Sequence, residues 1–334
     1  MTTATKSTPP QAAPKGRTAR IVAGSLAILV GVVFIAVTLI NNLFAVGPAF
    51  EDMIDDFRPI LTDEALGTAS ADVATLQSAG EEFQTTIVPA MSQALGMTPE
   101  QFTGMVQENY PAVAQGMAAL PDITATFSGL IQTLDSQQEL FASADAIPTE
   151  NLPATTVPWI ITISGILAIV AGILLLRPGR AGGITAVVLG GVLLVVTFAL
   201  SLPQKAADAD QLNENLQPVY TQELIDGATV ALQTVGAMGQ QMQAQMLPDL
   251  AGQLGMNEEQ LGAFMAENFP ATAAAMQTME ASLQNFSGMV EIFAQNLENY
   301  ETIQPVSFTP IIWMMVIGAV VILGAGGAVL VVTR

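Results

Sequence analysis

The sequence predicts an all-α integral membrane protein with four transmembrane helices in two tandem repeats. Three observations predict this class. Four apolar runs of 20 or more residues contain no charged side chain, and a stretch of seventeen residues occurs twice in related form. No alternation of apolar and polar residues, which a half-buried strand would need, continues for a useful length. We therefore expect each repeat to contain a transmembrane helix, a helical external domain and a second transmembrane helix.

The repeated stretch is LGMTPEQFTGMVQENYP at Leu95–Pro111, and it returns 159 residues later as LGMNEEQLGAFMAENFP at Leu254–Pro270. Eight of the seventeen positions are identical. The same offset carries Gly24 onto Gly183, inside two of the apolar runs, so the copied unit is a membrane segment with the domain that follows it. An even number of crossings per copy predicts that the copies are parallel and related by a pseudo-twofold axis along the membrane normal.

The composition excludes an ordinary soluble protein. Hydrophobic residues make up 51% of the chain, charged residues make up 11%, and the formal net charge is −20. A membrane protein with acidic exposed parts fits these values. The chain has no cysteine and no histidine, which removes thiol chemistry, the usual general base near neutral pH and the commonest metal ligand. We expect no enzyme activity, no metal site and no cofactor.

The apolar runs divide the chain into segments. A helix of 20 residues rises about 30 Å, which is the thickness of the hydrocarbon core of a bilayer. A cleaved signal peptide is the alternative for the first run, but the run exceeds the apolar part of such a peptide. We expect a disordered basic cytoplasmic tail at residues 1–20, transmembrane helices at residues 21–46, 157–176, 183–202 and 309–332, external helical domains at residues 47–156 (domain A) and 203–308 (domain B), and a cytoplasmic turn at residues 177–182.

Charged residues are segregated by sign along the chain. The tail, the turn and Arg334 hold seven of the nine basic residues, whereas all 29 acidic residues lie in Glu51–Glu150 and Asp208–Glu301. Basic residues concentrate on the cytoplasmic side of membrane proteins, so both termini and the turn are expected there. The alanine-rich, lysine-poor composition is compatible with a bacterium. The expected location is the plasma (inner) membrane, with two large external domains in the cell envelope.

This layout resembles that of the four-pass tetraspanin and claudin families, which also have two external segments, a short inner turn and cytoplasmic termini. The resemblance is one of layout. The cysteine motifs of those families have no counterpart in this chain, and its two external segments are near-equal copies. The resemblance therefore implies a topology and no site residue.

Each external domain is predicted to be a compact bundle of about three helices. The signals that begin and interrupt these helices occur in both copies. They are capping boxes at Thr98 with Gln101 and at Asn257 with Gln260, short helices that end near Asn109 and Asn268, long helices that begin at Pro111 and Pro270, and a further helix at residues 63–95 and 223–254 that Pro89 and Pro248 interrupt.

The long helix of each copy carries an apolar seam that advances by three and four residues alternately over four heptads. Such a seam must be buried against a helix of the same domain, of the other copy or of an oligomeric partner. We expect Phe127, Phe286 and Phe293 to be buried, because each occupies a d position of the seam. The seam residues are Met117, Leu120, Thr124, Phe127, Ile131, Leu134, Gln138 and Phe141 in the first copy and Met276, Met279, Leu283, Phe286, Val290, Phe293, Leu297 and Tyr300 in the second.

Several patterns have a functional and a structural interpretation, and the structural one is expected for each. Small residues at a spacing of four let membrane helices approach closely. Methionines four apart could bind a soft metal, but the first copy has Ala, Phe and Ile in their place, so core packing is predicted. Acidic clusters without the loop of an EF-hand are expected to be solvated. The small residues are Ala23, Ala27 and Gly31, Ser164, Ala168 and Gly172, and Gly324 and Ala328. The methionines are Met238, Met242 and Met246, and the acidic residues are the cluster Glu51, Asp52, Asp55 and Asp56 and the matched pair Glu100 and Glu259.

Two classes of function fit this sequence. The first is a non-catalytic accessory or scaffolding protein whose external domains bind a cell-envelope or membrane protein partner. The alternative is a carrier or export factor for a lipid or another apolar molecule. A homo-oligomer is also left open, while the acidic external segments exclude nucleic acid as a partner. The candidate contact residues are the repeated corners Glu108, Asn109, Tyr110 and Pro111, and Glu267, Asn268, Phe269 and Pro270.

Overall fold

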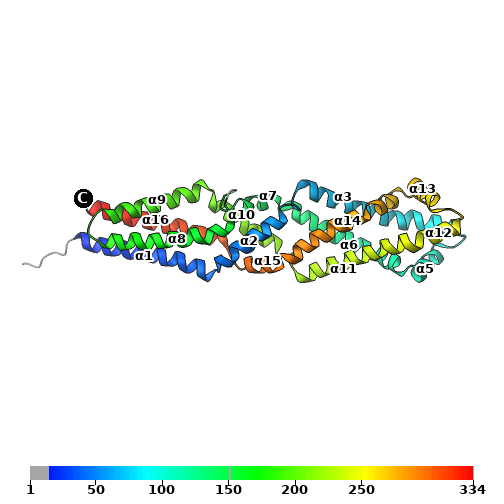
Figure 1. Cartoon of the computed structure of the whole chain (residues 1–334), viewed down its shortest axis with the longest axis horizontal. Coiled ribbons are helices and arrows are strands. Elements are labelled where there is room, and N and C mark those ends of the chain that lie inside the picture. Colours follow the sequence, from blue (N-terminus) through cyan, green and yellow to red (C-terminus); the bar gives the residue numbers. More distant parts are fainter. Residues whose placement is uncertain (1–14, 150–151, 334) are drawn as a thin grey trace, which may run out of the picture. The chain divides into compact units, whose positions relative to one another are not determined.

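The structure, a computed structural model, describes residues 15–149 and 152–333, which form helices joined by short turns (Figure 1). The chain divides into two compact units. Unit 1 contains the described residues of Met1–Glu51, Leu140–Asn213 and Thr302–Arg334, and unit 2 contains Asp52–Glu139 and Glu214–Glu301. Each unit therefore takes segments from both sequence copies.

Unit 1 contains four long apolar helices, as the sequence predicts. They are α1 (Lys15–Ile40), α8 (Val157–Leu176), α9 (Ala181–Ala199) and α16 (Phe308–Val332). Among the described residues, these are the helices long and apolar enough to cross a membrane. α1 packs along α8 and α9 packs along α16, while further contacts join α1 to α16 and α8 to α9. The presence of four candidate membrane spans is thus confirmed.

Small residues bring the paired membrane helices together. A Cβ atom added to Gly24 would lie 2.8 Å from the carbonyl oxygen of Gly172, and one added to Gly326 would lie 2.7 Å from that of Gly183. Such distances exclude any side chain, so the close approach requires glycine. The predicted packing role of Gly324 and Ala328 is wrong, because both residues are exposed. Gly324 and Ala328 each lie two residues from Gly326, so they point away from the face of α16 that packs against α9.

The first membrane helix begins and ends earlier than expected. Residues 1–14 of the predicted tail lie outside the described residues, but residues 15–20 belong to α1, since lysine and arginine are good helix formers. α1 ends at Ile40 rather than at residue 46, because Asn42 adopts a left-handed conformation with φ of 49°. Ser201, 159 residues later, has φ of 53° and follows the end of α9. A left-handed residue interrupts a right-handed helix.

A new helix follows each break, namely α2 (Leu43–Phe57) and α10 (Leu202–Leu216). In unit 1, each supplies a carboxylate to the N-terminus of a membrane helix. Glu51 accepts a hydrogen bond from the amide of Ala154 at 2.5 Å, in the short helix η2 (Ala154–Thr156) that leads into α8. Asp210 accepts bonds from the amides of Phe308 and Thr309, at 2.6 and 2.9 Å, where α16 begins. Both carboxylates also interact favourably with the helix dipole.

Unit 2 is built on four long helices, two from each copy. They are α3 (Asp63–Glu82), α6 (Pro111–Ser136), α11 (Gln222–Gln241) and α14 (Pro270–Gln295). α3 packs against α6 and α14, and α11 packs against the same two helices. The helices of the two copies thus form one bundle and not a compact bundle in each copy, and of the three possibilities for burying the seams the structure shows packing against the other copy. The apolar faces of one copy are buried against those of the other, as the rings of Phe127 and Phe286 illustrate, with centroids 4.9 Å apart.

At the interruptions predicted around Pro89 and Pro248, the helix continues through a wider turn that lies just before each proline. π-helical segments at Phe83–Ile87 (η1) and Met242–Met246 (η3) connect α3 and α11 to α4 (Val88–Ala94) and α12 (Leu247–Leu254). A proline cannot donate the usual backbone bond and crowds the carbonyl four residues earlier, which the wider turn accommodates. Met238, Met242 and Met246 are all buried, so their predicted role in core packing is confirmed.

Both predicted capping boxes are present. The amide of Gln101 donates to the Thr98 hydroxyl, the amide of Gln260 donates to the Asn257 side chain, and each glutamine side chain accepts from the amide of its cap residue. These boxes begin α5 (Pro99–Asn109) and α13 (Glu258–Asn268). Each motif forms within four consecutive residues, which is why the sequence predicts it well.

The apolar seams are buried where the sequence places their phenylalanines. Phe127, Phe286 and Phe293 expose 4%, 3% and 3% of their surfaces, as predicted. The seams do not continue over four heptads of one helix, however. α6 and α14 end at Ser136 and Gln295, and the short helices α7 (Gln138–Asp145) and α15 (Leu297–Ile303) follow.

The residues at these two breaks, Gln137 and Asn296, are buried polar residues with partners in the other copy. Asn215 donates a hydrogen bond to the side-chain oxygen of Gln137 at 2.7 Å, and Asn296 donates to Asp56 at 2.8 Å. Buried amides need such partners. The breaks therefore place equivalent polar contacts between the copies within unit 2.

Candidate functional site

The two predicted corners lie where α5 meets α6 and where α13 meets α14. The aromatic residue of each corner is buried, with Tyr110 exposing 4% and Phe269 exposing 2% of its surface. The other six candidate contact residues, Glu108, Asn109, Pro111, Glu267, Asn268 and Pro270, are exposed. Each corner thus has an internal anchor and an outward-facing polar side.

The backbone geometry of the corners follows from their sequence. The side-chain amides of Asn109 and Asn268 each donate to the carbonyl four residues earlier, at 2.9 Å, and so satisfy an acceptor at the end of the short helix. Tyr110 and Phe269 leave the helical region, with φ near −130° and −136°, because a proline follows each of them. The corner is therefore a helix junction fixed by local chemistry.

The N-termini of α6 and α14 are capped by side chains of the other copy. Gln241 accepts hydrogen bonds from the amides of Ala112 and Val113, at 2.8 and 3.2 Å. Glu82 accepts from the amide of Thr272 at 2.7 Å and from the preceding amide at 3.4 Å. Neither cap was predicted from the sequence. The available signal was that residues 82 and 241 are 159 apart and that both long helices begin at a proline without a capping side chain of their own.

The first corner makes one contact that the second cannot. The Tyr110 hydroxyl donates to the carboxylate of Asp249 at 2.8 Å. Burial, and then the hydrogen bond and charge of Asp249, raise the pKa of Tyr110 to about 12. Phe269 has no hydroxyl, so the corners differ in their polar anchoring.

A groove of about 410 Å³ lies in unit 2 beside the second corner. Its walls come from η3, α12, α13 and α14, and its floor is largely apolar and contains two methionines, a side chain that adapts to different partners. It is lined by Gln243, Leu247, Pro248, Leu261, Gly262, Met265, Ala273, Met276 and Gln277.

Two residues that line this groove differ from their counterparts in the first copy. At the offset of 159, Leu261 corresponds to Phe102, and Gly262 corresponds to Thr103. The Phe102 ring is fully buried, and the leucine that replaces it in the second copy has a smaller side chain. The first copy has a groove of about 290 Å³ in which Gln84 and Met117 stand where the second copy has Gln243 and Met276, but its other lining residues come from α3 and α6, and Phe102 is not among them.

The surroundings of the groove are acidic. Residues 52–139 and 214–301 hold 24 acidic residues and a single basic residue, Arg58, which pairs with Asp55 at 2.8 Å. Glu259 and Glu280 are exposed, and they lie three residues before Gly262 and four residues after Met276. Helical spacing places each on the same side of its helix as a groove residue.

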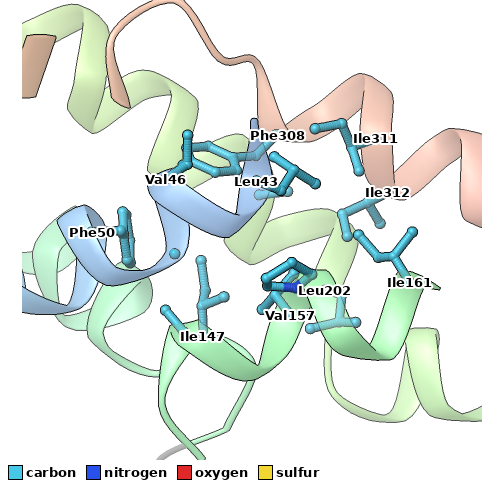
Figure 2. Close-up of a pocket in the computed structure, with 14 residues that line it drawn as sticks. Leu43, Val46, Phe50, Ile147, Val157, Ile161, Leu202, Phe308, Ile311 and Ile312 are labelled. Carbon is cyan, nitrogen blue, oxygen red and sulfur yellow. The ribbon is translucent and has the colours of Figure 1, made fainter. Parts of the chain in front are cut away.

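Unit 1 contains a smaller, apolar pocket of about 60 Å³, and Figure 2 shows the side chains that surround it. They come from α2, α8, α10, α16 and the segment before α8. The lining consists of Leu43, Val46, Gly47, Phe50, Ile147, Ala154, Val157, Pro158, Ile161, Leu202, Ala206, Phe308, Ile311 and Ile312.

The carboxylates considered as candidate metal ligands do not converge on a common point. Glu51 and Asp56 bind Ala154 and Asn296, and Asp55 pairs with Arg58. Among the described residues, no group of three acidic side chains is placed to hold a metal ion.

Comparisons with protein-family models, curated proteins and solved structures found no match to this chain.

Proposed function

We propose that this protein is a non-catalytic, four-pass membrane scaffold or accessory subunit whose unit 2 binds a cationic segment of another cell-envelope protein. The observation that carries the proposal is the groove of the second copy, which combines an apolar floor with acidic neighbours. An apolar side chain of the partner occupies the floor, and basic side chains beside it meet Glu259 and Glu280. Complementary charge speeds encounter and selects among partners.

The proposed topology rests on the segregation of charge. Both termini and the turn at residues 177–182 lie in the cytoplasm, and the acidic segments lie outside. Equivalent hydrogen bonds in the two copies, from Ala154 to Glu51 and from Phe308 to Asp210, support a parallel repeat with a pseudo-twofold axis along the membrane normal.

Reporter fusions test this topology. A reporter at Gln84 or at Gln243 is expected outside the cytoplasm, and one at Gly179 inside it. If residues 84 and 243 were accessible from opposite sides, the parallel repeat would be abandoned.

The second corner belongs to the proposed contact surface. Glu267 and Asn268 are exposed at the junction of α13 and α14, the two helices that supply Leu261 and Met276 to the groove. The corresponding residues of the first corner are Glu108 and Asn109, and Phe102 stands there in place of Leu261. The first corner therefore serves as an internal control for the second.

The filled core of unit 2 favours a scaffold over a lipid carrier. A carrier needs a continuous apolar cavity between its helices. The cavity between α3, α6, α11 and α14, beside Phe127 and Phe286, measures only about 20 Å³, which is room for roughly one water molecule. The apolar seams serve as closed core at this place.

Photo-crosslinking in living cells tests the proposed function. A photoreactive amino acid replaces Gln277 in the groove or, as a control, its exposed counterpart Ala118. We expect an adduct with one basic protein segment from position 277 and none from position 118. The yield in isolated membranes should fall at high salt, since exposed charges are screened.

Two matched substitutions separate the groove from general effects on folding. Leu261→Phe fills the groove with the side chain that the first copy carries, and it should abolish the adduct. Phe102→Leu makes the reverse change in the first copy and should leave the adduct intact, provided that the protein stays folded. An adduct that survives Leu261→Phe, or that forms equally from position 118, would overturn the proposal.

A further inference from the structure

The apolar pocket of unit 1 lies at one end of its membrane helices. Val157, Pro158 and Ile161 come from the first turns of α8, and Phe308 and Ile311 come from those of α16. Figure 2 shows side chains of α2, α8 and α16 converging on the space. Every lining residue is apolar or glycine. An apolar cavity of this kind does not retain water, so a group that enters it is expected to be apolar.

The two tryptophans of the chain mark the depth of this pocket in the membrane. Trp159 follows the lining residue Pro158, and Trp313 follows the lining residue Ile312. They expose 58% and 48% of their surfaces. Exposed tryptophans on membrane helices gather at the level of the lipid headgroups. The pocket therefore lies where lipid hydrocarbon chains begin.

The volume of the pocket fits a short piece of such a chain. A cavity of about 60 Å³ has room for roughly four groups of the size of a water molecule. A lipid chain enters the pocket from an equally apolar bilayer, so occupancy is favoured by the van der Waals contacts that fill the void and not by removal of apolar surface from water. Occupancy needs no hydrogen bond, and the lining offers no polar side chain that would hold a headgroup.

We propose that this pocket binds the upper segment of one hydrocarbon chain of a membrane lipid. The lipid is chosen over a protein side chain because the lining comes from the ends of membrane helices at the level of Trp159 and Trp313, where lipid chains are always present. The site is independent of the groove in unit 2.

A photoreactive lipid tests this proposal. The full-length protein is reconstituted in phosphatidylcholine vesicles with a small fraction of phosphatidylcholine that carries a diazirine close to its ester. After irradiation, labelled residues are mapped by mass spectrometry. Phe50 is the diagnostic residue, since it lines the pocket and exposes only 6% of its surface. Val195 on α9, which exposes 68%, reports ordinary contact with the bilayer. We expect both residues to be labelled.

Filling the pocket should remove the diagnostic label alone. Ala206→Leu places a larger side chain in the pocket, and it should lower labelling of Phe50 by about tenfold, because the leucine side chain occupies most of the space that the lipid chain would fill. Labelling of Val195 should not change. Val46→Phe fills the same pocket from α2 and replaces the first variant if that one does not fold. Val195→Leu is the matched control and should leave labelling of Phe50 unchanged.

Two results would overturn the proposal. The first is labelling of Val195 without labelling of Phe50 in the unmodified protein, which would leave the pocket to an apolar side chain of another protein. The second is labelling of Phe50 that persists in a folded Ala206→Leu variant.

Discussion

In each unit, the N-termini of two main helices are capped by a side chain from a distant part of the chain, and the units differ in which sequence copy supplies it. In unit 1 the caps stay within a copy, since Glu51 accepts from Ala154 and Asp210 accepts from Phe308. In unit 2 they cross between the copies, where Gln241 caps α6 and Glu82 caps α14. A helix whose cap comes from the other copy is completed only when both copies are folded together.

Helix packing follows the same division. Several close glycine contacts of unit 1 join the backbones of helices of one copy, such as Gly24 of α1 with Gly172 of α8. Unit 2 instead brings Phe127 of the first copy against Phe286 of the second. Membrane helices are stable singly in lipid and need only close packing to associate, whereas helices in water must bury their apolar faces. One copy therefore holds a complete membrane pair but only half of the core of unit 2.

The largest expected effect comes from separating the copies. Residues 1–178 expressed alone should insert into the membrane, but they should not form a monomeric, folded equivalent of unit 2. Since the copies are related in sequence, we expect the half chain to pair with itself. Light scattering in detergent should then give the mass of a dimer.

Co-expression of residues 1–178 with residues 179–334 is the control for this experiment, and it should yield a one-to-one complex. A monomeric half chain whose α3 and α6 resist proteolysis would show that a single copy folds without the other. The distinction between the two units would then be lost.

The next largest effect concerns the contact between the copies at the centre of unit 2. Phe286→Ala in the full-length chain should lower the free energy of unfolding by about 3 to 5 kcal/mol, because the ring is buried. Phe127→Ala should behave similarly. The double variant should fall short of additivity by about 0.5 to 1.5 kcal/mol, which is the usual coupling of an aromatic pair. Denaturant unfolding in detergent measures all three values, and strict additivity would argue against direct ring contact.

Local signals in the sequence predicted local structure well. The capping boxes at Thr98 and Asn257 and the helices that begin at Pro111 and Pro270 depend on residues only a few positions apart. The break at Asn42 was missed because a left-handed residue was not expected without glycine. Packing of the seams against the other copy was one of three possibilities that the sequence left open, because Glu82 and Thr272 are separated by 190 residues and periodicity cannot choose between partners.

The candidate site was predictable in part. The repeat drew attention to the corners, and one of them lies at the groove, but the lining of the groove differs between the copies. Leu261 and Phe102 are both apolar, so a pattern of apolar residues treats them as equivalent. Only side-chain volume within a packed helix arrangement distinguishes them.

The caps that cross between the copies should have a smaller effect than the aromatic core. Gln241→Ala removes the acceptor for Ala112 and Val113 and should cost about 0.5 to 2 kcal/mol of stability. Gln240→Ala, at the exposed neighbouring position, is the control and should change stability by less than about 0.5 kcal/mol. Thermal unfolding followed by circular dichroism measures both. If the two substitutions lowered stability equally, the cap would contribute no more than an ordinary surface residue.

Glu82→Gln sharpens this comparison because it gives α14 the kind of cap that α6 already has. The side-chain oxygen of the glutamine still accepts the hydrogen bond from the backbone amide of Thr272, while the interaction of a negative charge with the helix dipole is lost. We expect a loss of about 0.3 to 1 kcal/mol, which should shrink as salt is added. A loss that does not depend on salt would assign the effect to packing.

The smallest effect distinguishes the two corners from each other. Tyr110→Phe converts the first corner to the residue of the second and removes the hydrogen bond to Asp249, at a cost of about 0.5 to 1.5 kcal/mol. Because folding raises the pKa of Tyr110 from 10.0 to about 12, its stabilising contribution is complete below pH 10 and is lost as the pH rises through about 12. The stability difference between the unmodified protein and the variant should therefore stay constant up to pH 10 and then shrink. Tyr220 and Tyr300 also titrate at high pH, but they are present in both proteins and cancel in the difference. A difference that stayed constant up to pH 12 would show that the two corners are anchored by the buried ring alone.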